Sequence, residues 1–252
     1  MKFIITLLVC ISALLQLSSA ANVLVIPDEK LEKNLVKKIG DMVDEKKTVS
    51  SAIITEQLKR KVVKLKLNAP NKDILEDIYA SCVDSVGIID SVYNCGKCDN
   101  WHRTGSATCW ALTEDIMVTN YHVFANANHP GWGVTNRRGE LSLVTEILAA
   151  DRISDIAIFR IKGGNFKPLN FGETQKVGGD VHIIAHPAGR YFTYSRGHVT
   201  RYSASRVGNG NVWMGVSAEY ARGSSGGPVL DSAGNVIGMV ANTQSIYYGN
   251  AG

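Results

Sequence analysis

The feature that most restricts the fold of this chain is a glycine-rich loop at residues 223–228, with the sequence Gly-Ser-Ser-Gly-Gly-Pro. Glycine adopts backbone angles closed to other residues and lets a second chain segment come close. The N–H groups of Gly223 and Ser225 can therefore converge beside the Ser225 hydroxyl. Two such donors stabilise the oxyanion of an acyl-transfer reaction, each by roughly 3 kcal/mol. Taken alone, the loop is explained equally well as a turn between two strands.

Two further motifs stand in strand-like surroundings upstream of this loop. An apolar run at 116–119 leads to His122, and Asp155 opens an alternating apolar run at 156–161. A serine hydroxyl becomes a useful nucleophile when an imidazole takes its proton, and that imidazole needs a carboxylate on its other nitrogen. A lone histidine is more often structural, but here three residue types occur in three matching contexts. They predict a catalytic triad of His122, Asp155 and Ser225.

With these motifs the chain resembles the trypsin-like (chymotrypsin-fold) serine endopeptidases, and most closely their bacterial Deg-type and related secreted branch. The likeness covers roughly residues 74–245 and rests on five stretches in family order: 105–107, 119–123, 154–158, 177–189 and 223–228. It implies that His122 is the general base and acid, that Asp155 orients it, and that Ser225 is the nucleophile. The backbone N–H groups of Gly223 and Ser225 would form the oxyanion hole.

The second half of the chain has the spacing of an all-β protein. Short apolar runs separated by Gly, Asn and Asp recur about every ten residues from residue 85 onward, which is typical of a sandwich or barrel. The resemblance implies a peptidase domain over 74–252 with two Greek-key β-barrels. Their expected bounds are about 81–164 and about 165–252, joined near 163–165.

The first 73 residues differ from this pattern. Residues 1–20 have the positive start, apolar run and small-residue end of a signal peptide, so we expect an exported chain, secreted or extracytoplasmic, without a membrane anchor in its mature form. Residues 21–73 are rich in Lys and Glu and predict a mainly helical extension. An amphipathic helix is expected at 22–48, a helical start and a strand-like end (63–67) at 51–67, and a short helix around 74–79. Its apolar face favours docking on the barrels or an aid to folding.

Four cysteines remain after the signal peptide: Cys82, Cys95, Cys98 and Cys109. An even number in an exported chain favours disulfides, while a zinc site built from all four and free thiols stay open as alternatives. The other histidines share no metal spacing and are expected to be structural or exposed: His102, His129, His182, His186 and His198. We therefore expect no metal ion and no cofactor.

The resemblance also suggests where a substrate binds. Glu219 and Tyr220 would help to wall the specificity pocket, with an acidic Glu219 favouring a basic side chain or simply facing solvent. The strand after residue 238 would offer backbone groups of Ala241, Asn242 and Thr243 to an extended substrate. A net charge of +4 is small for 252 residues, so protein or peptide partners are expected rather than nucleic acid.

Two departures from the trypsin pattern matter. Ser224 stands where enzymes activated by cleavage have an aspartate, so activation by a new N-terminus is not expected. The family also has a further strand after 236–240, which residues 245–248 would have to supply unless the sequence is incomplete. The alternative functions are a catalytically weak, protease-like binding module and a zinc-dependent hydrolase that uses the cysteines.

Overall fold

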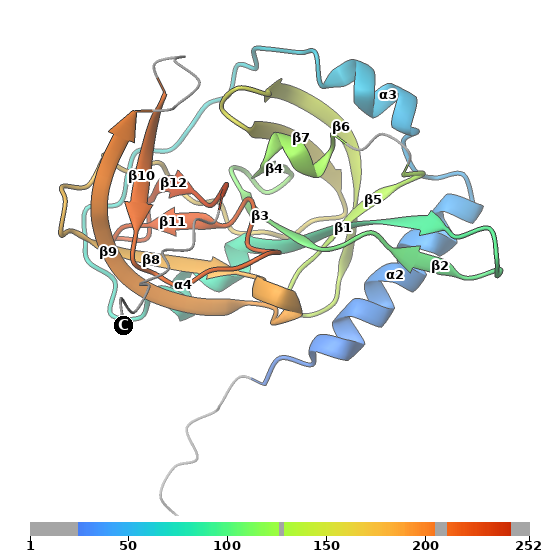
Figure 1. Cartoon of the computed structure of the whole chain (residues 1–252), viewed down its shortest axis with the longest axis horizontal. Coiled ribbons are helices and arrows are strands. Elements are labelled where there is room, and N and C mark those ends of the chain that lie inside the picture. The colour runs from blue at the N-terminus through green and yellow to red at the C-terminus, as the bar shows by residue number, and fades with distance from the viewer. Residues whose placement is uncertain (1–24, 126–128, 205–210, 243–252) are drawn as a thin grey trace, which may run out of the picture.

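The structure is a computed structural model that describes residues 25–125, 129–204 and 211–242. The predicted signal peptide, Thr243 and the predicted closing strand at 245–248 lie outside these ranges. In the described part of the chain, no helix is long and apolar enough to cross a membrane. Figure 1 shows two β structures side by side, with α2 along one of them.

The first β structure is a closed barrel. Its strands are β1 (Val86–Asn94), β2 (Trp101–Arg103), β3 (Ala107–Ala111), β4 (Ile116–Thr119), β5 (Trp132–Thr135), β6 (Leu141–Asp151) and β7 (Ile156–Lys162). Their order is β2-β1-β3-β4-β7-β6-β5, and β1 also pairs with β5, which closes six strands into a ring. Met117, Phe124 and Phe159 are fully buried within it.

The second β structure is a half-barrel in the described residues. Its strands are β8 (Asp180–Ala185), β9 (Thr193–Ala204), β10 (Val212–Val216), β11 (Pro228–Leu230) and β12 (Val236–Met239), in the order β10-β9-β8-β11-β12. Val181, Ile183 and Val229 fill its core. The predicted all-β, two-barrel fold is confirmed, with the second barrel open.

The predicted N-terminal helix is α2 (Asp28–Asp44). Leu31, Leu35 and Ile39 recur at helical spacing, and all three are buried in one core cluster with residues of the first barrel. Gly40 leaves room for the Trp101 ring, which a Cβ atom at this position would meet at 2.3 Å. The apolar face of α2 is therefore covered by the barrel.

Polar contacts tie α2 to both β structures. Glu32 pairs with Arg103 of β2 and accepts a hydrogen bond from the Tyr191 hydroxyl at 3.2 Å. The Asp28 carboxylate accepts from the Tyr191 backbone N–H at 3.1 Å. Because Tyr191 lies between β8 and β9, the helix bridges the two halves of the molecule.

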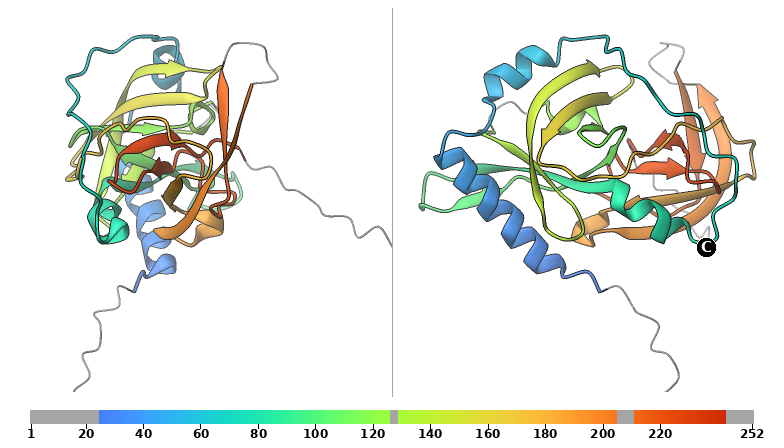
Figure 2. Two further views of the ribbon diagram at one scale, coloured as in Figure 1. Left: turned by 90° about the vertical axis from the view of Figure 1, so that its left-hand side faces the viewer. Right: turned by 180° about the vertical axis from the view of Figure 1, so that it is seen from behind.

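The rest of the extension consists of α3 (Ser51–Gln57), a long segment at 58–77, and α4 (Ile78–Cys82), which continues into η1 (Val83–Ser85). The segment 58–77 runs around the molecule from one β structure to the other (Figure 2). The Arg60 carbonyl accepts from Ala150 of β6, and the Leu75 N–H donates to Ser232 beside β11. The predicted strand at 63–67 is wrong, because this stretch has no partner strand although its apolar side chains alternate.

The cysteines do not come together as a group of four. All four are free thiols. Cys82 packs near Gly234, whereas Cys109 lies in the first barrel near Gly87, and burial raises the pKa of both thiols. The four-cysteine zinc site and the hydrolase based on it are therefore wrong, and the disulfide prediction finds no support.

Candidate active site

The register of β4 and β7 places the predicted histidine beside the predicted aspartate. Thr119, the last residue of β4, pairs with Ala157 near the start of β7. The chain beyond β4 therefore meets the chain before β7. Asn120 is fully buried and donates its side-chain N–H to the Asp155 carbonyl at 2.9 Å. His122 follows in the short helix η2 (Tyr121–Val123).

Asp155 contacts His122 at two points. Its Oδ2 atom lies 2.8 Å from the ring Nδ1 of His122, and its Oδ1 atom accepts from the His122 backbone N–H at 2.9 Å. A carboxylate accepts hydrogen bonds, so Nδ1 carries the proton and Nε2 is left as the basic nitrogen. The Asp155 side chain is 23% exposed and the His122 side chain 49%. The imidazole thus faces solvent while its partner lies deeper.

The loop that carries Ser225 is fixed from both halves of the molecule. The backbone carbonyl of Ser225 accepts a hydrogen bond from the N–H of Thr108 in β3 at 2.8 Å. On the other side, Gly226 donates to the Val240 carbonyl at 2.8 Å, and Val240 donates to Gly227 at 2.9 Å. Gly226 has φ +84°, and a Cβ atom there would lie 2.1 Å from the Thr108 carbonyl oxygen. Only glycine fits this position.

Gly223 also needs to be glycine. Its φ is +98°, and a Cβ atom would lie 2.4 Å from the His186 carbonyl oxygen. The Thr108 hydroxyl donates to the Gly223 carbonyl at 2.9 Å. Within the described ranges, the N–H groups of Gly223 and Ser225 donate to no other backbone group. Both donors are therefore available to an external acceptor.

Ser224 is fully buried and uncharged, and its hydroxyl accepts from the Ala221 N–H at 3.3 Å. The loop therefore holds its shape without an ion pair at this position.

Thr108 links the serine loop to the histidine loop. Its carbonyl accepts from the hydroxyl of Thr119 at 2.7 Å, one residue before the turn that leads to His122. No hydrogen bond joins His122 to Ser225, although both lie in the described residues. Catalytic hydrogen bonds are often loose without substrate and tighten when it binds.

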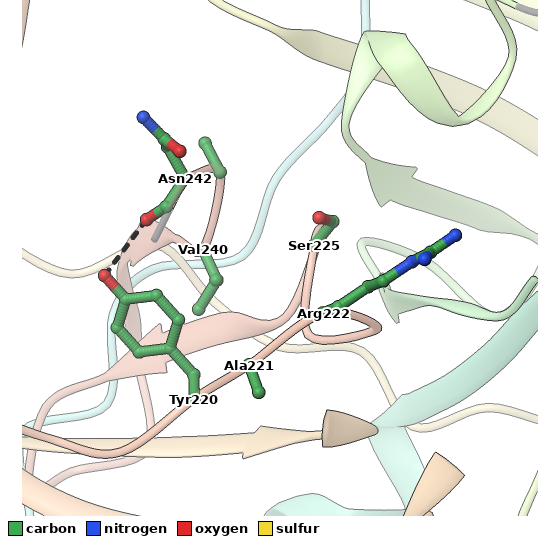
Figure 3. A pocket seen from close by; sticks show the side chains of 7 residues that line it. Tyr220, Ala221, Arg222, Ser225, Val240 and Asn242 are labelled. Atoms are coloured by element: carbon green, nitrogen blue, oxygen red, sulfur yellow. Dashed lines mark hydrogen bonds between the residues drawn. The ribbon is translucent and has the colours of Figure 1, made fainter. Parts of the chain in front are cut away.

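A pocket of about 510 Å³ opens beside Ser225. It is lined by Tyr220, Ala221, Arg222, Ser225, Val240, Ala241 and Asn242 (Figure 3). The Tyr220 hydroxyl donates to the Asn242 carbonyl at 3.1 Å, which joins its two walls. Three of the predicted substrate residues, Tyr220, Ala241 and Asn242, thus lie in one pocket with Ser225.

Glu219 is exposed and does not line this pocket, while Thr243 lies outside the described residues. Sequence reasoning missed Ala221, Arg222 and Val240. They could have been found in the sequence, because they lie directly before the glycine-rich loop or at the end of the apolar run 236–240.

His186 is a buried structural histidine at the base of the serine loop. Its Nδ1 accepts from the Phe192 N–H at 3.0 Å, and its carbonyl lies against Gly223. Burial lowers the pKa of His186 to about 4, so its ring is neutral near pH 7.

Comparisons with known proteins show the family and the fold of this chain. The model of the trypsin-like peptidase domain matches residues 105–239. Serine protease Rv3671c of Mycobacterium tuberculosis is 28% identical over 144 residues, which cover 53% of this chain and 35% of that protein. A probable periplasmic serine endoprotease, DegP-like, of Hahella chejuensis is 31% identical over 130 residues, covering 50% of this chain and 27% of that protein.

Among solved structures, the HtrA-type protease AlgW with a decapeptide superposes with a TM-score of 0.57 at 20% identity. The superposition covers 67% of this chain and 58% of that one, and it supports the fold. The matches to the two curated relatives span about a third or less of those proteins.

Proposed function

Since the chain belongs to the trypsin-like peptidase family, we propose that it is a Deg-type serine endopeptidase and that His122, Asp155 and Ser225 form its catalytic triad. The observation that carries this proposal is the double contact of Asp155 with His122. This contact leaves Nε2 of His122 free to act as a base. The glycine-rich loop carries Ser225 at the edge of a pocket. The alternative of a weakly catalytic binding module has no observation of its own in its favour.

In the proposed reaction, His122 Nε2 takes the Ser225 hydroxyl proton as Oγ attacks the substrate carbonyl carbon. The N–H groups of Gly223 and Ser225 stabilise the resulting oxyanion. His122 then gives the proton to the leaving amine, and water hydrolyses the acyl-enzyme by the same steps in reverse. Asp155 stays ionised and balances the charge on the imidazolium.

The pocket beside Ser225 would take the substrate side chain that precedes the cleaved bond. Its lining includes Tyr220, Val240 and Ala241 and no carboxylate, and the guanidinium of its one cation, Arg222, extends away from Tyr220 and Asn242 (Figure 3). We therefore infer a preference for an uncharged side chain, in place of the basic one that a pocket with Glu219 would favour. The substrate backbone would run along residues 241–242. Cleavage of a peptide library varied at this position tests the preference.

We also propose that the chain acts outside the cytoplasm. The features of residues 1–20 support export, and a relative from Hahella chejuensis is named as periplasmic. N-terminal sequencing of the protein recovered from the host's extracytoplasmic fraction tests this. A start at Ala21 is expected, and an intact Met1 would contradict export.

Labelling with a fluorophosphonate probe tests the triad. We expect the parent protein to be labelled and Ser225→Ala to lose both the label and the hydrolysis of peptides. Ser217→Ala is a matched control, because the Ser217 hydroxyl lies 3.1 Å from Nδ1 of a histidine, His198, but Ser217 is not part of a glycine-rich loop. Equal labelling of Ser225→Ala would place the nucleophile elsewhere. A folded parent protein without label or hydrolysis would favour a binding module.

A further inference from the structure

The hairpin between β1 and β2 gathers two thiols and one imidazole at its tip. Cys98 Sγ lies 3.5 Å from Cys95 Sγ and 3.1 Å from His102 Nε2. The three ligand atoms all lie within 4.8 Å of one another. None of these residues takes part in the proposed peptidase reaction.

The fold of the hairpin brings this group together. His102 of β2 pairs with Tyr93 of β1, and their rings lie 5.5 Å apart. The turn from Cys95 to Cys98 includes Gly96 at φ +68°, whose N–H donates to the Asn94 side chain at 2.7 Å. The two cysteines come from this turn and the histidine from the strand that follows it.

We propose that Cys95, Cys98 and His102 form a zinc site with one open coordination position. Thiolate sulfur and imidazole nitrogen are the ligands that Zn²⁺ prefers in proteins, and Cys-x-x-Cys is a common ligand spacing. The site replaces the expectation that the chain binds no metal. It differs from the four-cysteine site considered above, since Cys82 and Cys109 lie in the core.

Two of the three separations between ligand atoms are close to those around a tetrahedral ion, and the third, between Cys95 and His102, is within 4.8 Å. With Zn–S near 2.3 Å and Zn–N near 2.0 Å, the edges of the tetrahedron are about 3.8 Å between sulfurs and about 3.5 Å between sulfur and nitrogen. The distances of 3.5 Å and 3.1 Å are shorter by only a few tenths of an ångström. Small side-chain rotations would therefore admit the ion.

The surroundings of the thiols also favour binding. The cysteines are partly or fully exposed, so an ion can reach them from solvent. Binding releases the thiol protons and leaves the fourth position to water or to a ligand from outside the chain.

The site lies close to the contact between the hairpin and the N-terminal helix α2. Trp101, next to His102, packs on Gly40 of α2 and donates to Asp44 at 3.2 Å. The hairpin and α2 lie on the side of the first barrel away from β10–β12 (Figure 1). We therefore expect zinc to stabilise the hairpin and its contact with α2.

Cobalt and zinc titrations of the reduced full chain test the proposal. We expect one equivalent of Co²⁺ to produce thiolate-to-cobalt charge-transfer absorption and the visible bands of a tetrahedral complex, and Zn²⁺ to displace it. Cys98→Ser should abolish the charge-transfer band, and His102→Ala should weaken binding by at least about tenfold. The control His198→Ala removes an exposed histidine of β9 and should bind as the parent does.

Alkylation of the thiols separates a metal site from a disulfide. Zinc should slow alkylation of Cys95 and Cys98, and a chelator should restore it. Folded parent protein that shows no thiolate–cobalt absorption when reduced would overturn the proposal. So would thiols that resist alkylation with or without chelator until a reductant is added, because they would be joined as a disulfide. Neither readout depends on peptidase activity, so failure here leaves the proposed triad untouched.

Discussion

Asp155 holds both the ring and the backbone of His122. One carboxylate oxygen lies 2.8 Å from Nδ1, and the other accepts from the backbone N–H at 2.9 Å. The second bond does not depend on the protonation of the ring. An amide at position 155 can therefore keep the loop in place through its oxygen while it no longer sets the tautomer of the imidazole.

Asp155→Asn is accordingly expected to fold normally and to lose activity. The asparagine NH₂ group would favour a proton on Nε2, which removes the base, and kcat should fall by about 10⁴-fold. Steady-state hydrolysis of a peptide substrate measures this. Asp73→Asn is the matched control, because Asp73 is an exposed carboxylate in the segment before α4, outside the histidine, aspartate and serine loops. If Asp155→Asn keeps more than about a tenth of the parental kcat, Asp155 is not the orienting group.

Gly226→Ala should disrupt the serine loop. A Cβ atom there would meet the Thr108 carbonyl at 2.1 Å and the Thr119 hydroxyl at 2.3 Å, in addition to the strain of φ +84°. We expect a loss of several kcal/mol in unfolding free energy or a displaced loop without activity.

Gly178→Ala provides the comparison for this variant. Gly178 has φ +86° but nothing within 4 Å of an added Cβ atom, so only the backbone strain of about 1–2 kcal/mol should appear. Urea unfolding of both variants tests the difference. Equal losses in the two would show that the contacts with Thr108 and Thr119 do not matter.

The local motifs identified residues that the fold brings close together, because each motif reflects a local constraint. Gly223 and Gly226 must be glycine for reasons present in the loop itself: a positive φ and a close backbone neighbour. The pairing of Asp155 with His122 follows from two strand ends that their apolar patterns locate. Such constraints are visible in sequence without knowledge of the whole fold.

Features that depend on distant partners were not predicted. The alternation at 63–67 is that of a strand, but a strand needs a free sheet edge, and the chain instead crosses the barrel surface. Likewise, Glu219 does not line the pocket that Arg222 lines, because the path of the loop decides which residues border the pocket. His102 meets Cys98 only through the pairing of β1 with β2, which no spacing along a helix would reveal.

The free energy of unfolding should fall as the pH drops from about 6.5 toward 5. Burial lowers the pKa of His186 from 6.5 to about 4. In this range the unfolded chain takes up a proton that the folded chain does not, so the contribution of His186 to stability is complete above pH 6.5 and is lost progressively as the pH falls toward 4. The slope from one such group is at most about 1.4 kcal/mol per pH unit. Burial also lowers the pKa of His129 and His182, which add in the same direction.

His186→Gln isolates the contribution of this one ring. Glutamine does not titrate, so the variant should lose less stability per pH unit than the parent, whatever its stability at neutral pH. Denaturant unfolding at about pH 7.5, 6.5 and 5.5 measures the slopes. Parallel slopes would mean that His186 is protonated equally in both states. Carboxyl groups with a lowered pKa, such as Asp84, titrate below this range, whereas burial raises the pKa of Asp90, whose opposite contribution is common to parent and variant and cancels in the comparison of slopes.

Ile39→Ala should show that α2 is part of the folded unit. Ile39 is fully buried and lies against Gly133 of β5, so its truncation leaves a cavity and should cost about 2–5 kcal/mol. Val62→Ala is the control, because Val62 is 79% exposed and its loss should change stability by less than about 0.5 kcal/mol. Thermal or urea unfolding distinguishes the two.

Removal of α2 distinguishes a docking helix from an inhibitory segment. A chain shortened to begin at Asp73 loses α2 and exposes the apolar surface that Leu31, Leu35 and Ile39 cover. We expect it to be less stable than the chain from Ala21 and no more active toward a general peptide substrate. Ser224 carries no charge that would need a new N-terminus, so we expect no activation by cleavage near residue 73. If the shortened chain hydrolyses the peptide substrate and the longer chain does not, α2 and α3 belong to an inhibitory propeptide.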